Sequence, residues 1–236
     1  AQGVMQYTRV GIFSANKEGY LVDTAGRMVQ GYGPSAGGAQ GVMGDIKIPT
    51  GQIPAVATTR IDYVGNLSHG YTTPAVSPLD PANDKSYNYV KQSVVYDSVG
   101  NQHTLTQYFV KAATPANTMN VHYAVDGGAP MTTPVRTLTF NTKGELPAGT
   151  TQAISIPAAG GVDAMNFTIS YDGTTHVAGE STNTTNRSNG YASGSFVGVE
   201  LAEDGSVVAK YSNEQRQVVG TLAIATFPDE GSLAPT

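Results

Sequence analysis

Residues 195–213 read SFVGVELAEDGSVVAKYSN, and they decide the fold class that this sequence predicts. Apolar residues alternate with others on either side of a central Asp-Gly pair, which is typical of strands with one buried face. Asp204-Gly205 suits a two-residue hairpin turn, because both central positions of such a turn favour positive φ. The stretch therefore predicts a β-hairpin in which two sets of side chains each share a face: Val197, Val199 and Leu201, then Val207, Ala209 and Tyr211.

The same pattern of strand, glycine turn and strand recurs along the chain. Further turns are predicted around Lys17–Gly19, Lys143-Gly144 and Asp172-Gly173. Residues 217–227, QVVGTLAIATF, predict another strand in which Leu222 and Ile224 share a face. No window of a dozen residues shows clean 3.6-residue apolar periodicity, because Gly, Pro or Asn interrupts almost every candidate helix. The chain is therefore predicted to be all-β.

Three stretches are predicted to be long loops or joints: 31–44, 69–86 and 178–190. The first is too Gly-rich for a strand and too long for a plain hairpin turn, and loops of that length usually have a function. The second is expected to be a proline-rich connector with a short helical turn, and the third has almost no apolar content. Because the last two bracket the middle of the chain, they predict an outer β-rich domain of residues 69–190, inserted into a discontinuous base domain of residues 1–68 and 191–236.

Composition excludes several classes of function. Charged residues make up 13% of the chain, against ~25% in a typical soluble domain, and the formal net charge is -5. With no basic run either, the chain is not expected to bind nucleic acid or an anionic membrane, and no apolar run approaches the ~18 residues that span a bilayer. There is no Cys, so disulfides and thiolate metal sites are excluded, and a large Cys-free chain fits a bacterial exterior. The amino end has neither a signal-peptide pattern nor an initiator Met, so we expect a fragment.

Residues 94–104, VVYDSVGNQHT, hold the three residue types of a hydrolytic triad: Asp97, Ser98 and His103. A catalytic Ser needs a base within hydrogen-bond reach and a nearby oxyanion hole. Residues 98–101 instead have the composition of a turn, in which Asp97 and Ser98 accept hydrogen bonds from the backbone N–H groups that follow. No G-x-S-x-G elbow occurs in the chain. We therefore expect no catalytic residues here. His103 is placed on the strand that follows, beside partly buried neighbours at even spacing, namely Leu105, Gln107 and Phe109.

Metal and cofactor sites are not expected either. The four histidines, at positions 69, 103, 122 and 176, never fall at the spacings of a ligand pair. Asp80, Asn83 and Asp84 lie close together, as in a calcium loop, but the segment lacks the alternating oxygen ligands, the Gly and the terminal Glu of an EF-hand. A solvated loop and a cation-binding loop both remain open for residues 80–84. Residues 33–41 hold glycines, but neither the Lys nor the spacing of a phosphate-binding loop.

Three segments resemble proteins of the bacterial flagellar axis. Residues 7–32 are similar to the axial-protein form Y-T-R-N-G-x-F followed by D/N-x-x-G-x-L-V, with Val10 where Asn is common. Residues 86–111 look like the flagellar hook protein signature V-Y-D-S-x-G-N-x-H and Y-F-V-K. Residues 189–233 resemble the later hook series N-G-Y-x-x-G, D-G-x-V and Y-S-N-x-Q. Since the matches occur in order over most of the chain, it is identified by resemblance as a member of the flagellar hook protein family.

The resemblance implies a function that composition does not show. Hook proteins polymerise into the curved tube that joins the flagellar rod to the filament, where it acts as a universal joint transmitting torque, and they leave the cell through the flagellar type III channel. The implied partners are further copies of the chain and the hook cap, rod and hook-filament junction proteins, with no cofactor. Hook proteins also carry terminal helices, which this chain lacks. We therefore expect a core fragment that is extracellular in its native hook and monomeric by itself.

The loop at residues 31–44 lies where hook proteins carry a projecting loop. Its candidate subunit-interface residues are Gly33, Pro34, Ser35, Val42, Met43 and Gly44. Val42 and Met43 are predicted to form an apolar tip, and a surface excursion without contacts is the alternative. Two other classes of function remain open: a bacterial surface adhesin or carbohydrate-binding β module, and a hydrolase that uses Ser98 and His103.

Overall fold

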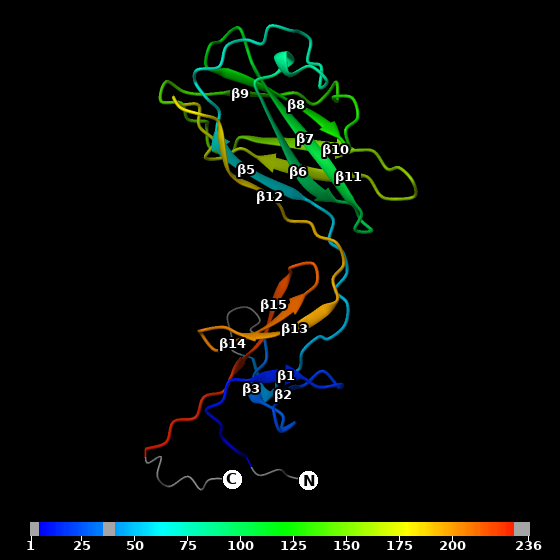
Figure 1. Ribbon diagram of the computed structural model, residues 1–236, viewed down its shortest axis with the longest axis vertical. Helices are drawn as coiled ribbons and strands as arrows, with labels where there is room; N and C mark the ends of the chain where they lie inside the picture. The colour runs from blue at the N-terminus through cyan, green and yellow to red at the C-terminus, as the bar shows by residue number, and fades with distance from the viewer. Residues whose placement is uncertain (1–4, 35–40, 229–236) are drawn as a thin grey trace. The chain divides into compact units, whose positions relative to one another are not determined.

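The computed structural model describes residues 5–34 and 41–228, which fold into two compact units (Figure 1). The base unit comprises Ala1–Ile53 and Gly194–Thr236, and the insert unit is Pro54–Ser193. The predicted fold class is confirmed, because the regular elements of the described ranges are strands and one short 3-10 turn. The units divide after residues 53 and 193 instead of after residues 68 and 190, because residues 60–66 form an inner strand of the insert unit.

The base unit is built from a small hairpin and a five-stranded sheet. The hairpin pairs β1 (Phe13–Ala15) with β2 (Leu21–Asp23). The sheet has the order β13-β14-β15-β3-β4, with the bounds β3 (Gln30–Tyr32), β4 (Met43–Asp45), β13 (Phe196–Leu201), β14 (Ser206–Tyr211) and β15 (Arg216–Leu222). One face of this sheet covers a small core, whose buried members are Leu21, Ile46, Ile48, Val207, Ala209, Tyr211 and Val219.

The insert unit contains two four-stranded sheets that share one core. One sheet has the sequential order β6 (Tyr89–Tyr96), β7 (Gln102–Lys111), β8 (Thr118–Val125) and β9 (Arg136–Thr139). The other has the order β10 (Thr151–Ile156), β11 (Met165–Ser170), β5 (Arg60–Asn66) and β12 (Thr182–Ser188). All pairs are antiparallel except β11 with β5. The 3-10 turn η1 (Asp84–Ser86) lies in the proline-rich connector, as predicted.

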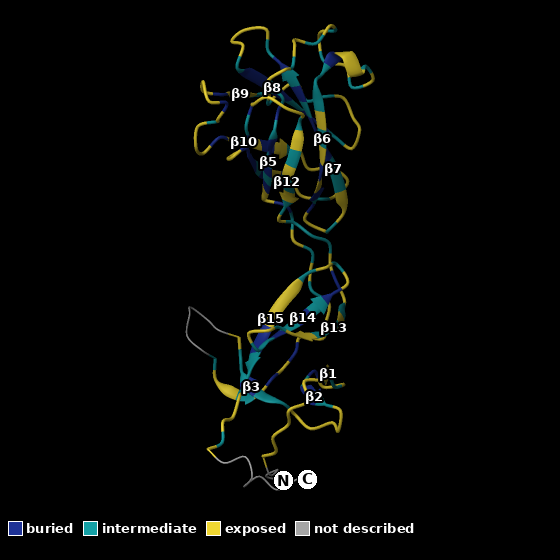
Figure 2. Cartoon of the chain, turned by 60° about the vertical axis from the view of Figure 1, so that its left-hand side comes forward, coloured by how far each residue is buried: buried dark blue, intermediate teal, exposed yellow. Residues whose placement is uncertain are grey.

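Alternation along the strands places the core of the insert unit between its sheets. In β5, Ile61 and Tyr63 are buried, whereas Arg60 is exposed and Asp62 is half-buried. Both sheets contribute to the core cluster, whose members are Ile61, Tyr63, Leu67, Val95, Leu105, Phe109, Met119, Val121, Tyr123, Leu138, Phe140, Ile154, Met165, Phe167, Ile169 and Tyr171. Figure 2 shows the buried parts of the chain in dark blue. Because burying one such side chain contributes roughly 1.5–3 kcal/mol, this cluster is the main source of stability.

Several five-residue turns share the same hydrogen-bond pattern. They begin at Asn16, Asp23, Asp97 and Asn141, and in each of them the fourth residue is a Gly with φ between 77° and 89°. The N–H of the first residue donates to the C=O of the fifth, and the Gly N–H donates back to the C=O of the first. The side-chain oxygen of the first residue accepts from the N–H groups of the third and fifth residues. Such an Asx turn satisfies the polar backbone groups of a tight loop locally.

The opening hairpin is confirmed, but its turn and one of its faces differ from the prediction. Ala202 and Ser206 close a three-residue loop in which Gly205 has φ 83°, so positive φ is confined to the glycine and does not include Asp204. The register shifts between Phe196 and Gly198, which leaves Val197 in a bulge with 61% of its surface exposed. Bulges of this kind turn a side chain away from the face that its sequence position predicts. The strand β13 therefore directs Phe196 and Val199 towards the core, whereas β14 behaves as predicted.

Several other predicted elements are corrected by the structure. The polar stretch 178–190 is not only a surface loop, because residues 182–188 form the edge strand β12 beside β5. The strand predicted over 217–227 ends at Leu222, and Ile224 is 85% exposed. The turn at Asp172-Gly173 forms, but the residues after it make only isolated bridges from Thr175 to Asn66 and Glu145. An edge strand tolerates polar residues because one of its sides faces solvent.

A chain of hydrogen bonds crosses the core of the insert unit. The Tyr171 hydroxyl donates to Gln107 Oε1 over 2.6 Å and therefore accepts from the Tyr123 hydroxyl, 2.7 Å away. Gln107 Nε2 contacts Ser93 Oγ, which in turn donates to the side chain of Asn186 on β12. The Asn186 amide also donates to the C=O of Gln92, so this edge strand is joined to β6 of the other sheet. Burial raises the pKa of Tyr171 and Tyr123, which keeps both hydroxyls protonated.

Removing hydroxyl groups from this chain tests its contribution to stability. Tyr171→Phe should lower the free energy of unfolding by about 1–3 kcal/mol, because it leaves buried groups of Gln107 and Tyr123 without a partner. Tyr123→Phe removes only the terminal donor and should cost less. The matched control is Tyr63→Phe, because the Tyr63 hydroxyl is buried without a partner. Urea unfolding measures all three, and a loss for Tyr63→Phe equal to that for Tyr171→Phe would contradict the prediction.

Candidate functional site

The stretch VVYDSVGNQHT spans the end of β6, a turn and the start of β7. Asp97 begins the turn, and its Oδ1 accepts from the N–H groups of Val99 and Asn101. Its Oδ2 accepts from the side-chain amide of Asn101 over 2.8 Å. Gly100 has φ 89°, and a Cβ atom there would stand 2.6 Å from the Cβ of Ala55. The role predicted for Asp97 in a turn is therefore confirmed.

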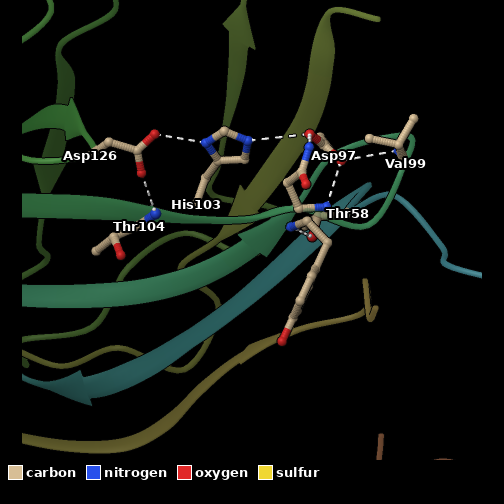
Figure 3. Close-up of polar contacts among 8 residues, drawn as sticks. Thr58, Asp97, Val99, His103, Thr104 and Asp126 are labelled. Carbon is tan, nitrogen blue, oxygen red and sulfur yellow. Dashed lines mark hydrogen bonds and ion pairs between the residues drawn. The ribbon is translucent and has the colours of Figure 1, made fainter. Parts of the chain in front are cut away.

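His103 lies between two carboxylates, as Figure 3 shows. Its Nδ1 is 2.7 Å from Asp126 Oδ2, and its Nε2 is 3.4 Å from Asp97 Oδ2. Ser98 is exposed in the turn, and neither ring nitrogen is directed at its hydroxyl. This geometry does not support nucleophilic catalysis by Ser98, because the base that would take its proton already faces acceptors on both sides. The residues at even spacing after His103, predicted to be partly buried, are completely buried: Leu105, Gln107 and Phe109.

The two carboxylates and the imidazole shift the pKa values of one another. The hydrogen bond to Asp126 is the largest cause that raises the pKa of His103. Burial by itself would raise the pKa of the Asp97 carboxyl, but hydrogen bonds from Asn101, Val99 and His103 outweigh burial and lower it. The pKa of Asp126 is lowered in the same way, because its bonds from His103 and the Thr104 N–H outweigh its partial burial. The cluster therefore favours the doubly hydrogen-bonded imidazolium between two carboxylates.

The His103 cluster makes stability depend on pH. Because the pKa of His103 is raised in the folded state, its contribution is fully present below about 6.5 and is lost as the pH rises through the folded value. The two aspartates act in the opposite direction, because their contribution is lost as the pH falls below about 3.8. His103→Gln should therefore remove the decline in stability that wild type shows as the pH rises above 6.5. Thermal unfolding between pH 5 and 9 tests this prediction.

Ser98→Ala is the matched control, because it changes the neighbouring turn without removing a titrating group. It should follow the wild-type profile of melting temperature against pH. If wild type and His103→Gln gave parallel profiles above pH 6.5, the carboxylates would not stabilise the imidazolium.

The Asp-rich loop at residues 80–84 uses its side chains for its own backbone. Asp80 Oδ1 accepts from the N–H of Ala82, and Asn83 Oδ1 accepts from the N–H of Lys85 to cap η1. Within residues 5–34 and 41–228, no three His, Cys, Asp or Glu side chains are grouped so that they could hold a metal ion. The same ranges contain no helix of the length and apolar content needed to cross a bilayer.

Two shallow hollows lie on the described surface. One lies between β1, β2, β13 and β14, is lined by Phe13, Leu21 and Val199, and has a cavity volume of about 60 Å³. The other lies along β10 and β11 beside Ala153 and Phe167 and has a cavity volume of about 260 Å³. Pockets for drug-sized ligands and cofactors usually enclose roughly 300–1,000 Å³. Both hollows are smaller than that, so neither has the size of a usual ligand pocket.

The predicted interface loop is the connection of a hairpin. Its ends are paired strands, with Gly31 opposite Gly44 and Tyr32 opposite Met43. The prediction that the whole segment 31–44 is too Gly-rich for a strand is therefore wrong at both ends. Gly31 suits this place because a Cβ atom there would stand 2.3 Å from the C=O oxygen of Thr221 on the neighbouring strand. The glycines thus permit close approach of the strands.

The candidate interface residues occupy different parts of this hairpin. Gly33 extends the ladder, because its N–H donates to the C=O of Val42, and Pro34 is exposed beyond it. Ser35 lies outside the described residues. Val42 is 88% exposed and Met43 is 48% exposed, but both stand at the base of the loop, so the predicted apolar tip is wrong. They nevertheless present apolar surface to solvent.

The outer face of the base-unit sheet continues this apolar surface. Alternation directs Val207 and Ala209 to the core, so Val208 points to the opposite face, where it pairs with Val218, which is 53% exposed. The exposed large apolar residues described in the base unit are Met5, Tyr7, Val10, Ile12, Met28, Val42, Met43, Val197, Leu201, Val218 and Ile224. Figure 2 shows the exposed stretch of β15 in yellow. The described part of the base unit thus exposes more large apolar residues than that of the insert unit.

One buried cluster, formed by Lys111 and His176, was not predicted from the sequence. Lys111, at the end of β7, and His176 are 7% and 3% exposed, and their Nζ and Nε2 atoms are 3.3 Å apart. The two residues are far apart in the sequence, so spacing could not reveal their contact. The only signal was the place of Lys111 on the alternation of β7, where Leu105, Gln107 and Phe109 precede it on the same face.

The chain combines an inserted β-rich unit with a base unit whose strands and flanking segments carry exposed apolar residues. The family model of the flagellar basal body protein FlaE D2 domain matches residues 66–191. The flagellar hook protein FlgE of Salmonella typhimurium is 32% identical over 99% of this chain and 60% of its own length. The protein of the same name from Escherichia coli is 31% identical over 99% of this chain and 60% of its own length. The chain belongs to the flagellar hook protein family.

A solved structure shows the same fold. The crystal structure of the Helicobacter pylori flagellar hook protein FlgE2 matches 97% of this chain and 83% of that chain, with a TM-score of 0.60 and 12% sequence identity. At this identity the match concerns the fold alone. This chain spans about 60% of the length of the curated relatives from Salmonella and Escherichia coli.

Proposed function

We propose that this chain is the core of a structural subunit of the bacterial flagellar hook. In this proposal the full-length protein polymerises with itself into the curved tube that transmits torque from rod to filament. The observation that carries the proposal is the similarity to hook proteins over 99% of the chain, at 31–32% identity. The proposed location is the extracellular hook, reached by type III export, and the further partners are the hook cap, rod and hook-filament junction proteins. The fragment itself is proposed to be monomeric and to have no enzymatic activity.

The distribution of apolar surface supports a role of the base unit in assembly. Val42 and Ile224 are more than four-fifths exposed, whereas the exposed large apolar residues of the insert unit do not exceed the 63% of Val99. The rings of Tyr7 and Phe227 are 4.7 Å apart, so the segments before β1 and after β15 run side by side. We infer that the loop between β3 and β4 and the adjoining outer sheet face contact a neighbouring subunit.

The location of the protein tests the proposed function first. Gold-labelled antibody against this chain should bind intact cells of the source organism on the short curved segment between the cell body and the filament. Cells that lack the corresponding gene are the control for labelling. Label spread over the cell envelope would contradict the hook assignment and would favour the adhesin alternative.

Shortening the hairpin tests the proposed interface. Replacing residues 34–41 by a Gly-Ser turn spares the paired residues of β3 and β4, so the chain should keep its wild-type melting temperature. In the full-length protein the same change should impair formation of tubes, measured by electron microscopy of assembled hooks.

A matched pair of point variants separates an interface from a general surface effect. Val42→Ser should weaken assembly, because it removes a strongly exposed apolar side chain from the proposed contact. Val177→Ser, at a 41% exposed valine of the insert unit, should leave assembly unchanged. Normal tubes from both the shortened and the Val42→Ser proteins would reject the interface and leave the surface excursion as the explanation of the loop.

The two other classes of function have no support from the comparisons or from the geometry. An adhesin or carbohydrate-binding module would be revealed by glycan binding, and the two hollows described above are smaller than the usual ligand pocket. A hydrolase would react with broad serine-directed probes through Ser98, whose environment lacks a free base.

A further inference from the structure

Three segments of the insert unit meet at His176. The first is the end of β5, where the C=O of Leu67 accepts from His176 Nδ1 over 2.7 Å. The second is the β7–β8 turn, reached through Lys111, whose Nζ is 3.3 Å from His176 Nε2. The third is the segment 174–177, which carries His176 itself and follows the turn after β11. The rings of Phe140 and His69 stand 5.0 Å from the His176 ring and cover it.

The hydrogen bonds define the state of both side chains. Because Nδ1 donates to a carbonyl oxygen, the neutral imidazole of His176 presents the lone pair of Nε2 to Lys111. The Lys111 ammonium also donates to the C=O of Ala116. Two neutral acceptors therefore hold a cation that is only 7% exposed. Among the described residues no carboxylate forms an ion pair with Lys111.

No charged group on the elements packed around His176 neutralises the ammonium of Lys111 in the described residues. The titratable neighbours of His176 are Lys111 at the end of β7 and His69 after β5. On the packed 141–145 turn, Lys143 and Glu145 are exposed, and the Glu145 carboxylate accepts from the side chain of Asn141. On the segment of His176 itself, Asp172 accepts from the N–H of Thr150, and Glu180 is exposed. A second positive charge in this place would meet Lys111 without an anion beside it.

We propose that neutral His176 is a pH-sensitive latch, which holds the end of β5 and the β7–β8 turn together and releases them when the imidazole is protonated. Protonation converts Nε2 from an acceptor into a donor and places it against the ammonium of Lys111, so one hydrogen bond is lost and a like-charge pair is formed. The segment that leaves β5 is the connector 68–88, so opening of the latch loosens the start of this connector. The inference rests on the contacts of the insert unit and is independent of the proposed function.

The direction of the pH dependence follows from the same contacts. Burial is the largest cause that lowers the pKa of His176, and the charges of Lys111 and His69 lower it further, while the bond to Leu67 acts in the opposite sense. The open segment would have the ordinary histidine pKa of about 6.5. Below pH 6.5 His176 therefore binds fewer protons in the closed latch than in the open one. The stability of the closed latch falls as the pH drops from 6.5 towards the lowered pKa that His176 has in the closed state.

Amide hydrogen exchange on the intact 236-residue chain tests the latch. The reporting amides are those of Leu67, His69 and Ala112, which donate to Thr175, Val177 and Thr118. Between pH 7.5 and 5.5 their protection factors, corrected for the intrinsic pH dependence of exchange, should fall by up to about tenfold, as expected for one proton taken up with an open-state pKa near 6.5. In His176→Gln, which keeps a neutral donor and acceptor, this fall should be absent.

Lys111→Met is the second variant, because it removes the opposing charge and leaves His176 in place. Its acid-induced loss of protection should be smaller than in wild type, and it keeps the test decisive if His176→Gln does not fold. His122→Gln is the control, because His122 is a partly buried histidine on β8 outside the cluster, and it should reproduce the wild-type fall. The latch would be overturned by unchanged protection in wild type, by an equal loss in His176→Gln, or by an equal loss in Lys111→Met.

Discussion

Positive φ at the fourth residue of a five-residue turn is the constraint on which the rest of this structure depends. A strand pair buries the correct face only if its register is correct, and a slip by one residue would move every apolar side chain to solvent. The turns that begin at Asn16 and Asp97 join the strand pairs β1–β2 and β6–β7 and set their register through local hydrogen bonds. At Gly144 the positive φ coincides with close packing, because a Cβ atom there would stand 2.6 Å from the C=O oxygen of His176. A single glycine thus serves both the turn and the neighbouring cluster.

The turns also place the polar groups of the insert unit. Asp97 closes its own turn and contacts His103 on the next strand, and Asp126 reaches the same histidine from the end of β8. At the other end of β7, Lys111 and His176 form a second buried contact. The pKa values of the two histidines shift in opposite directions. The hydrogen bond to Asp126 raises that of His103, whereas burial, together with the charge of Lys111, lowers that of His176. The contribution of the His103 contact is therefore lost as the pH rises above about 6.5, and that of the His176 contact as the pH falls below it.

The two units differ in the polarity of their exposed strands. In the insert unit, Asn186 joins the polar edge strand β12 to β6, so this side of the two sheets is closed by hydrogen bonds. In the base unit one sheet face covers the small core, and the other presents Val208, Val218 and Met43 outwards. Soluble proteins tolerate a small exposed apolar face. In an assembly such a face can serve as a contact surface. The contrast supports the proposal that subunit contacts involve the base unit.

Sequence alone determined the fold class, because strand alternation and glycine turns are local patterns that need no partner to be recognised. The opening hairpin, the turn role of Asp97 and the burial of the residues that alternate after His103 were all predicted on this basis. The family was also readable from sequence, because its ordered motifs lie within short segments. Local sequence patterns were therefore sufficient to predict the fold class and the family.

Only the tertiary structure decided the features that depend on distant residues. The strand character of 182–188 comes from pairing with β5, since its polar side chains give no apolar alternation. The exposure of Val197 comes from a bulge, and the place of Val42 at the base of a hairpin comes from the pairing of β3 with β4. Lys111, at the end of β7, contacts His176 of the segment 174–177 although the two residues are 65 positions apart in the chain. Pairing and close packing join residues that no spacing in the sequence connects, and this is the physical reason for the difference.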